Sequence, residues 1–204
     1  MSRNRLFFGA AFILVAVLLF ALIRGPGSDN NRRPTTALKA GAFEPPRDAP
    51  DFKLTGSNGS DVTLRAQRGK LVLLTFGFTN CAAVCPTTLA TLAQTRKALG
   101  KAAARVQVIF VTVDPDRDTS ARLREYMAAF DPTFIGATGN SQTLAAVRRA
   151  YGVTATREGS RPDYAVAHTS SIFLIDGAGK LRAMMPFGRG PADFLHDISL
   201  LATN

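Results

Sequence analysis

The chain of 204 residues has little of the chemistry that most enzymes use: two cysteines, two histidines and no tryptophan. It shows no glycine-rich phosphate loop, no Ser/His/Asp order and no pair of side chains suited to general acid and base catalysis. There is no internal repeat, and no nucleic-acid motif with interleaved aromatic and basic residues. These absences argue against a phosphate-cradling enzyme, a triad hydrolase and a nucleic-acid-binding protein.

Acidic residues are also scarce, since 25 Lys and Arg stand against 15 Asp and Glu, a formal net charge of +10. The hydrophobic fraction of 46% indicates a globular chain and not a disordered one. We attribute the positive charge to solubility and to attraction toward anionic lipid or an acidic partner.

An uncharged apolar run, Leu6–Ile23, stands near the start, with Arg3 and Arg5 before it and Arg24 after it. Its length suits a membrane-spanning helix. A cleaved signal peptide is the alternative, but the run lacks the small-residue cleavage site. We therefore predict that residues 1–24 form an uncleaved anchor in the inner membrane. A short N-terminus before a single span places the rest on the periplasmic side, although arginines on both sides of the run do not decide its orientation.

Glycine and proline mark residues 25–47 as a linker without hydrophobic periodicity. Residues 48–204 then form the domain. Within it the sequence predicts an α/β order in which strands and helices alternate before a final hairpin and helix, and this is the thioredoxin-like order. Residues 154–164 are polar and are predicted to be a loop. The predicted strands are 52–54, 62–64, 71–76, 106–113, 134–137, 171–175 and 181–185, and the helices are 86–99, 119–130, 141–152 and 191–201.

Both cysteines fall in one stretch, Phe76–Leu89. A buried strand precedes them, and Pro86 suits the first position of a helix. Cys85, as the residue before a proline, is expected near the N-cap, where unpaired N–H groups and the helix dipole lower a thiol pKa. Cys81 and Cys85 can close a disulfide or chelate one soft metal such as Cu(I). The alternative is a structural role, as two buried side chains or a disulfide whose short loop stabilises little.

The histidines differ in their setting. His196 lies among polar residues of the last predicted helix and is expected at the surface. His168 precedes the strand 171–175, where thioredoxins carry a cis-proline that faces their cysteine pair; this chain has no proline there. A neutral imidazole at that place can give a metal a third ligand beside two sulfurs. The alternative is a loop histidine hydrogen-bonded to the backbone.

Two other groups carry possible metal donors. Asp114, Asp116 and Asp118 have the chemistry of a hard-metal site, but carboxylates at a helix start more often cap and orient the turn. Met184 and Met185 offer thioethers, although strand alternation places at least one of them in the core. We favour structural roles for both groups.

Three motifs together resemble the Sco family of copper-binding proteins for cytochrome c oxidase assembly, across residues 48–202. The motifs are Gly77-Phe-Thr-x-Cys-x-x-x-Cys-Pro-Thr-Thr-Leu89, Val113-Asp-Pro-x-Arg-Asp-Thr119 and His168-Thr-x-x-Ile-Phe-Leu-Ile-Asp176. The resemblance implies a thioredoxin-like domain tethered by one N-terminal helix. It also implies a bound copper ion, Cu(I) or Cu(II), held by Cys81, Cys85 and His168.

The family resemblance further implies a metallochaperone and not an enzyme. It would receive copper from an upstream donor protein and help load the dinuclear copper site of cytochrome c oxidase subunit II, by giving copper, by reducing the cysteines of that subunit, or both. The chain departs from the family at Asn80, at Ala82 and Ala83, and at Ala167, where members often carry an Asp that can orient the imidazole. These departures bear on affinity and not on ligand identity.

Two thiol chemistries remain as alternatives. In a thiol-disulfide oxidoreductase, Cys81 or Cys85 attacks the disulfide of a partner and the other cysteine resolves the product. A thiol peroxidase is suggested by Val84–Thr87, but that chemistry needs a threonine and a proline where Ala82 and Phe78 stand.

Overall fold

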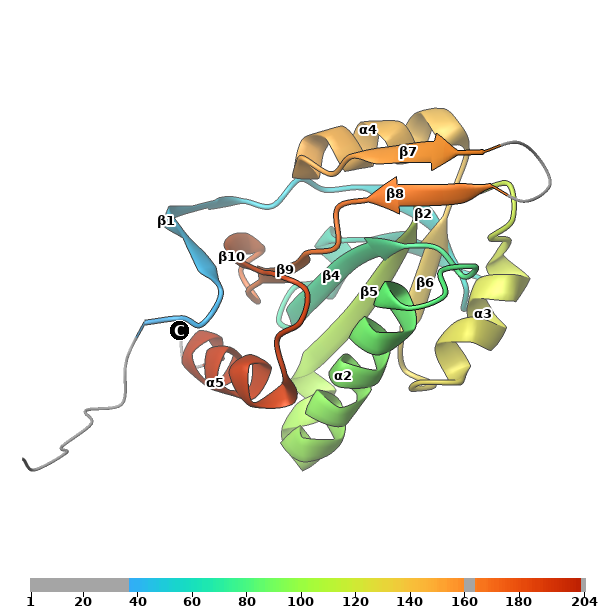
Figure 1. Ribbon diagram of the computed structural model, residues 1–204. Coiled ribbons are helices and arrows are strands. Elements are labelled where there is room, and N and C mark those ends of the chain that lie inside the picture. Colours follow the sequence, from blue (N-terminus) through green and yellow to red (C-terminus); the bar gives the residue numbers. More distant parts are fainter. Residues whose placement is uncertain (1–36, 160–163, 203–204) are drawn as a thin grey trace, which may run out of the picture. The chain divides into compact units, whose positions relative to one another are not determined.

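The computed structural model describes residues 37–159 and 164–202, in which a mixed sheet is flanked by helices (Figure 1). The sheet has eight strands in the order β1-β10-β9-β4-β5-β6-β2-β3, and a separate hairpin joins β7 to β8. The strands are β1 (Gly41–Asp48), β2 (Lys53–Gly56), β3 (Asp61–Thr63), β4 (Leu71–Gly77), β5 (Val106–Thr112), β6 (Ile135–Thr138), β7 (Ala155–Glu158), β8 (Ala165–His168), β9 (Ile172–Ile175) and β10 (Lys180–Met185). The helices are α2 (Val84–Leu99), α3 (Ser120–Ala128), α4 (Ser141–Tyr151) and α5 (Pro191–Leu201), with short 3-10 turns η1 (Arg65–Gln67) and η2 (Gly100–Arg105).

The two central strands, β4 and β5, pair in parallel, and every residue of both is buried. Strands buried on both faces are expected to be mostly apolar, and the sequence predicted these two from the apolar run at 71–76 and from the β-branched residues of 106–113. Their side chains alternate between two cores. Phe76 and Ile109 pack on the side of Leu144 in α4, whereas Leu73 packs on the side of α2, α3 and α5. Figure 1 shows α4 across the sheet from the other three helices. The predicted α/β class is confirmed.

The strand order determines where the ends of the central strands meet. Because β4 and β5 run in parallel, Gly77 and Thr112 end them side by side. Strand β9 runs antiparallel to β4, and Ile172 pairs with Thr75. The segment that enters β9 therefore meets the segment that leaves β4, at the kind of sheet edge where sites gather in α/β folds.

The linker prediction was wrong at its C-terminal end. Residues 41–48, predicted as linker, form β1 and pair antiparallel with β10 at the edge of the sheet. The register is irregular between Ala42 and Arg47, which brackets Pro45 and Pro46. Prolines are accepted in edge strands and bulges because no ladder hydrogen bond is required of them there. The predicted membrane anchor lies outside the described residues, and no helix within residues 37–159 and 164–202 is long and apolar enough to cross a membrane.

The loop predicted for residues 154–164 was also wrong, because residues 155–158 form β7 and pair with β8. Most of β7 is exposed and polar, so it lacks the alternation by which a half-buried strand is recognised. The hairpin is joined to the core through β8 and the residue before it, since Val166 and Tyr164 are buried with Phe76 and Phe78.

A buried carboxylate ties the last helix to the start of the domain. Asp197 of α5 is fully buried, and its two oxygens accept hydrogen bonds from the backbone N–H groups of Lys39 at 2.7 Å and Ala40 at 2.9 Å. A buried carboxylate of this kind stabilises a fold only while its oxygens and the N–H groups that donate to them stay paired. Asp197 thus holds the segment that leads into β1.

We predict that Asp197→Asn destabilises the protein. The amide has only one oxygen, so its NH₂ group would face one of the two backbone N–H groups, and that N–H would have no acceptor. The free energy of unfolding should fall by about 1–3 kcal/mol in urea titrations. Asp193→Asn on the same helix is the control, since its ion pair with Arg189 is partly exposed and should be worth less than about 1 kcal/mol. Equal losses in the two variants would contradict this role for Asp197.

Candidate metal centre

The cysteines lie where β4 leads into α2, with Cys81 on the connecting turn and Cys85 in the helix. The backbone N–H of Cys81 donates to the carbonyl of Phe78 at 3.3 Å, and α2 begins at Val84, after Ala83. Cys85 is therefore inside the first turn of the helix and is 3% exposed. A Cβ atom on Gly77 would come within 2.7 Å of the Cys85 sulfur, so this end of β4 requires glycine.

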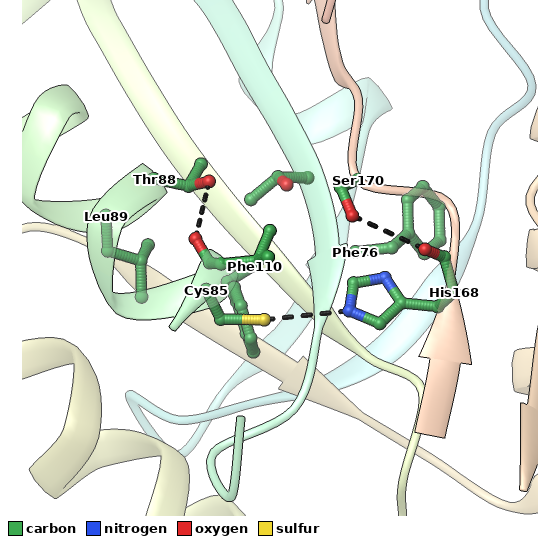
Figure 2. Close-up of a pocket in the computed structure, with 9 residues that line it drawn as sticks. Phe76, Cys85, Thr88, Leu89, Phe110, His168 and Ser170 are labelled. Carbon is green, nitrogen blue, oxygen red and sulfur yellow. Dashed lines mark hydrogen bonds between the residues drawn. The ribbon is translucent and has the colours of Figure 1, made fainter. Parts of the chain in front are cut away.

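Cys85 and His168 meet directly, although 83 residues separate them in the sequence. The Sγ atom of Cys85 lies 3.7 Å from Nε2 of His168, and Figure 2 shows the sulfur and the ring directed at each other. The ring of Phe78 stands edge-on against the imidazole, with centroids 5.8 Å apart. The two side chains line a cavity of about 10 Å³, which is space for one water-sized group.

The imidazole of His168 is held in the form that a metal needs. Its Nδ1 lies 2.9 Å from the carbonyl oxygen of Thr169. A carbonyl oxygen can only accept, so in the neutral imidazole Nδ1 carries the proton and the lone pair is on Nε2, on the side of Cys85. Such an outer hydrogen bond fixes tautomer and ring orientation in metal-binding histidines. The residues present therefore fit a soft metal ion bound between sulfur and nitrogen.

Cys81 adjoins this pair through the backbone. Its sulfur accepts from the N–H of Cys85 at 3.5 Å, and both cysteines are free thiols. Cys81 and His168 line the same open hollow. Among the described residues, no three His, Cys, Asp or Glu side chains are already arranged around one point as a complete ligand set. The structure brings the three predicted ligands to one place, and their joint binding of a metal stays a prediction.

The two thiols differ in acidity. The pKa of Cys85 is raised, whereas the sequence analysis predicted that it would be lowered. Burial raises the pKa of Cys85 to about 12. Partial burial also acts to raise the pKa of the Cys81 thiol. Hydrogen bonds from the backbone N–H groups of Cys85, Ala83 and Val84 outweigh this effect, so the pKa of Cys81 is lowered. The reason is position: Cys81 lies just outside the helix N-terminus, where its sulfur meets the N–H groups, whereas Cys85 lies within the first turn.

The aspartates after β5 serve the protein itself, as the sequence interpretation favoured. Asp114 and Asp118 are fully buried. Asp118 accepts hydrogen bonds from Thr79 and Thr112, whereas Asp114 pairs with Arg117 and accepts from the hydroxyl of Tyr164. Burial raises the pKa of Asp118, although these hydrogen bonds act to lower it.

Asp116, the third acidic residue of the turn, forms an ion pair with Arg157 of β7 at 2.6 Å. The carboxylates of this turn are thus bound to protein partners and are not gathered around a common point.

The remaining candidates lie elsewhere. Met185 is fully buried beneath the sheet and Met184 is 37% exposed, as strand alternation predicted. His196 lies on α5, where its Nδ1 is 2.9 Å from a carboxylate oxygen of Asp197. None of these three side chains lines the cavity between Cys85 and His168.

Sequence reasoning missed several residues that shape the site. Phe78 packs against the imidazole, Thr79 ties the cysteine turn to Asp118, and Tyr164 ties the approach to β8 to Asp114. Phe78 and Thr79 stand inside the first motif, which was the only available signal for them. Tyr164 carried no signal, because the strand that follows it was not predicted.

Comparisons with known proteins identify relatives of this chain. A family model described as SCO1/SenC matches residues 42–203. The copper-bound structure of ScoI from Bradyrhizobium japonicum superimposes with a TM-score of 0.70 at 35% identity, and the match covers 76% of this chain and 99% of that one.

Two curated proteins are similar in sequence. A putative copper-binding protein from Stutzerimonas stutzeri is 34% identical over 67% of this chain and 68% of its own length. An SCO2-like protein from Rickettsia felis is 38% identical over 64% of this chain, and the match spans 65% of the length of that relative.

The matched region contains the mixed sheet, the cysteine turn and His168, so the three motifs and the fold point to the same relatives. The thioredoxin-like α/β fold predicted from the element order is confirmed by the copper-bound ScoI structure. The chain belongs to the SCO1/SenC family.

Proposed function

We propose that this chain is a copper metallochaperone. It binds one copper ion, as Cu(I) or Cu(II), through the thiolates of Cys81 and Cys85 and the Nε2 atom of His168. It passes that copper to the dinuclear copper site of cytochrome c oxidase subunit II, after receiving it from an upstream donor protein.

The observation that carries the proposal is the 3.7 Å approach of the Cys85 sulfur to Nε2 of His168. Soft thiolates favour Cu(I), and an imidazole suits either oxidation state. The relative from Bradyrhizobium japonicum was solved with copper bound, which supports copper over other soft metals. The role in oxidase assembly rests on the resemblance to the Sco family.

Two properties of the site suit a carrier more than a permanent metal centre. A thiol ligates as the thiolate, so copper uptake must displace the proton that burial holds on Cys85, and the affinity therefore depends on pH. The hollow that Cys81 and His168 both line is open at the surface, and residues of the cysteine turn and of β8 surround it. A partner can therefore approach the metal from the Cys81 side.

The location follows from the start of the chain. We propose that Leu6–Ile23 anchors the protein in the inner membrane with the domain in the periplasm, because the run has the length of a span and paired thiols suit an oxidising compartment. The residues between this run and the domain would then connect the domain to the membrane.

A thiol-disulfide reductase is the second candidate, favoured by the lowered pKa of Cys81. The Cys81 thiolate would attack a disulfide of the partner, forming a mixed disulfide and releasing one partner thiolate. Cys85 would then attack the Cys81 sulfur, which frees the second partner thiol and leaves an intramolecular Cys81–Cys85 disulfide. The cysteines of oxidase subunit II are the proposed target.

The ligand set is tested by copper titration of the reduced protein against a competing chelator. The parent should bind one equivalent, and Cys81→Ser, Cys85→Ser and His168→Ala should each weaken binding by more than about 10-fold, the lower end of what loss of even an outer-shell partner costs. His196→Gln is the matched control and should bind as the parent does. A His168→Ala variant with parental affinity and spectrum would contradict the three-ligand site.

Copper delivery and thiol reduction are separated in a deletion strain complemented with the three ligand variants. Oxidase activity should be low in copper-poor medium and should rise when copper is added, because mass action then replaces the carrier. A reductase role predicts that activity stays low at every copper concentration in the two cysteine variants, and that His168→Ala keeps parental activity because the imidazole takes no part in the disulfide exchange.

Alkylation of the metal-free, reduced protein tests the difference in acidity. Because the pKa of Cys81 is lowered, a larger fraction of it is thiolate at neutral pH, whereas Cys85 stays protonated until the pH approaches its pKa of about 12. Cys81 should react with iodoacetamide more than about 10-fold faster than Cys85. Peptide mass spectrometry across neutral and alkaline pH measures both rates, and equal rates would refute the assignment.

A further inference from the structure

The turn between β5 and α3 holds the sulfur-bearing segment in place. The carboxylate of Asp118 accepts from the Thr79 backbone N–H at 3.1 Å and from its hydroxyl at 2.7 Å. It also accepts from the hydroxyl of Thr112, the last residue of β5, at 2.6 Å. Thr79 precedes Cys81 by two residues, so one fully buried carboxylate fixes the start of the cysteine turn to the end of β5.

The same turn holds the imidazole-bearing segment. Asp114 accepts from the hydroxyl of Tyr164, and Arg117 donates to the Tyr164 carbonyl at 3.1 Å while its guanidinium lies 3.8 Å from the centroid of the tyrosine ring. Tyr164 leads into β8, which ends at His168. Figure 1 shows the segment before α3 beside the start of β8.

The two sets of contacts, those of Asp118 with Thr79 and those of Asp114 with Tyr164, are joined through the backbone of the turn. The N–H of Asp118 donates to the carbonyl of Asp114 at 3.0 Å, which closes one turn of backbone between the two carboxylates. The N–H of Val113 donates to the carbonyl of Gly77 at 2.8 Å and anchors this turn to the end of β4. The segments that carry the sulfur and the nitrogen thus share one buried support, although neither aspartate forms a hydrogen bond with the side chain of Cys85 or His168.

We propose that Asp118 and Asp114 are positioning residues for the metal centre: together they set the separation of the Cys85 sulfur and the His168 nitrogen, and thereby copper affinity. The inference rests on the proposed copper function. The two sulfurs belong to one short segment, in which the Cys85 N–H donates to Cys81 Sγ, so their mutual geometry does not depend on this turn. The position of that segment relative to His168, however, does depend on the turn between β5 and α3.

If Asp118 positions the metal ligands, the effects of substituting Asp118 and His168 on copper affinity should be coupled. A general loss of stability predicts no such coupling. Copper dissociation constants are measured for the parent, Asp118→Asn, His168→Ala and the double variant, with the free energy of unfolding of each metal-free protein. Asp118→Asn should weaken binding about 10- to 100-fold in the parent, as outer-shell substitutions do. In the His168→Ala background it should weaken binding less than about 3-fold, because no imidazole remains to be aligned.

Milder and matched variants accompany the cycle. Thr79→Val and Tyr164→Phe each remove one hydroxyl while they keep both carboxylates, and each should weaken binding in the parent but not in the His168→Ala background. Asp197→Asn is the control, since it breaks a fully buried carboxylate network away from the site and should lower stability without changing copper affinity.

The outcomes separate the inference from the proposed function. If the parent binds no copper, the copper function itself fails, and if His168→Ala binds as the parent does, the three-ligand site fails. If the parent requires His168 but Asp118→Asn weakens binding equally in both backgrounds, Asp118 acts through its charge or through stability, and the positioning role is overturned. Unchanged affinity in Asp118→Asn, Thr79→Val and Tyr164→Phe would also overturn it.

Discussion

The site depends on the pairing of β4 with β9. This antiparallel register, in which Thr75 faces Ile172, carries the end of one strand and the entry to the other to the same place. Apart from Thr75 the paired residues of both strands are apolar, and the cores on either side of the sheet enforce their pairing. The distance between Cys85 and His168 is a consequence of that register, refined by the turn that follows β5.

Placement also gives the two cysteines different chemistry. Cys81 lies outside the helix among backbone N–H groups, and Cys85 lies inside it against the core, so the same motif contains an accessible, more acidic thiol and a buried, protonated one. A soft metal ion that reaches both would be exposed on one side and enclosed on the other. This asymmetry suits transfer between partners, and it equally suits attack on a disulfide by the outer thiol, which is why the two functions remain close in chemistry.

Much of the architecture could be predicted from the sequence because its central strands and helices have strong patterns. Leu71–Phe76 is an apolar run interrupted only by Thr75, and Gly100 follows the last residue of α2. The failures have physical causes: β1 contains two prolines that only an edge strand accepts, and β7 is too polar to show a half-buried period. The pairing of His168 with Cys85 was inferred from analogy of position, whereas the support by Asp114 and Asp118 depends on contacts that no local pattern encodes.

The most direct test of the central claim is X-ray absorption spectroscopy at the copper edge on the copper-loaded protein. The account predicts a first shell of two sulfur atoms and one imidazole nitrogen, with the nitrogen contribution lost in His168→Ala. A first shell of sulfur alone in the parent, or one of nitrogen and oxygen without sulfur, would contradict the claim that one copper ion is shared by both cysteines and this histidine.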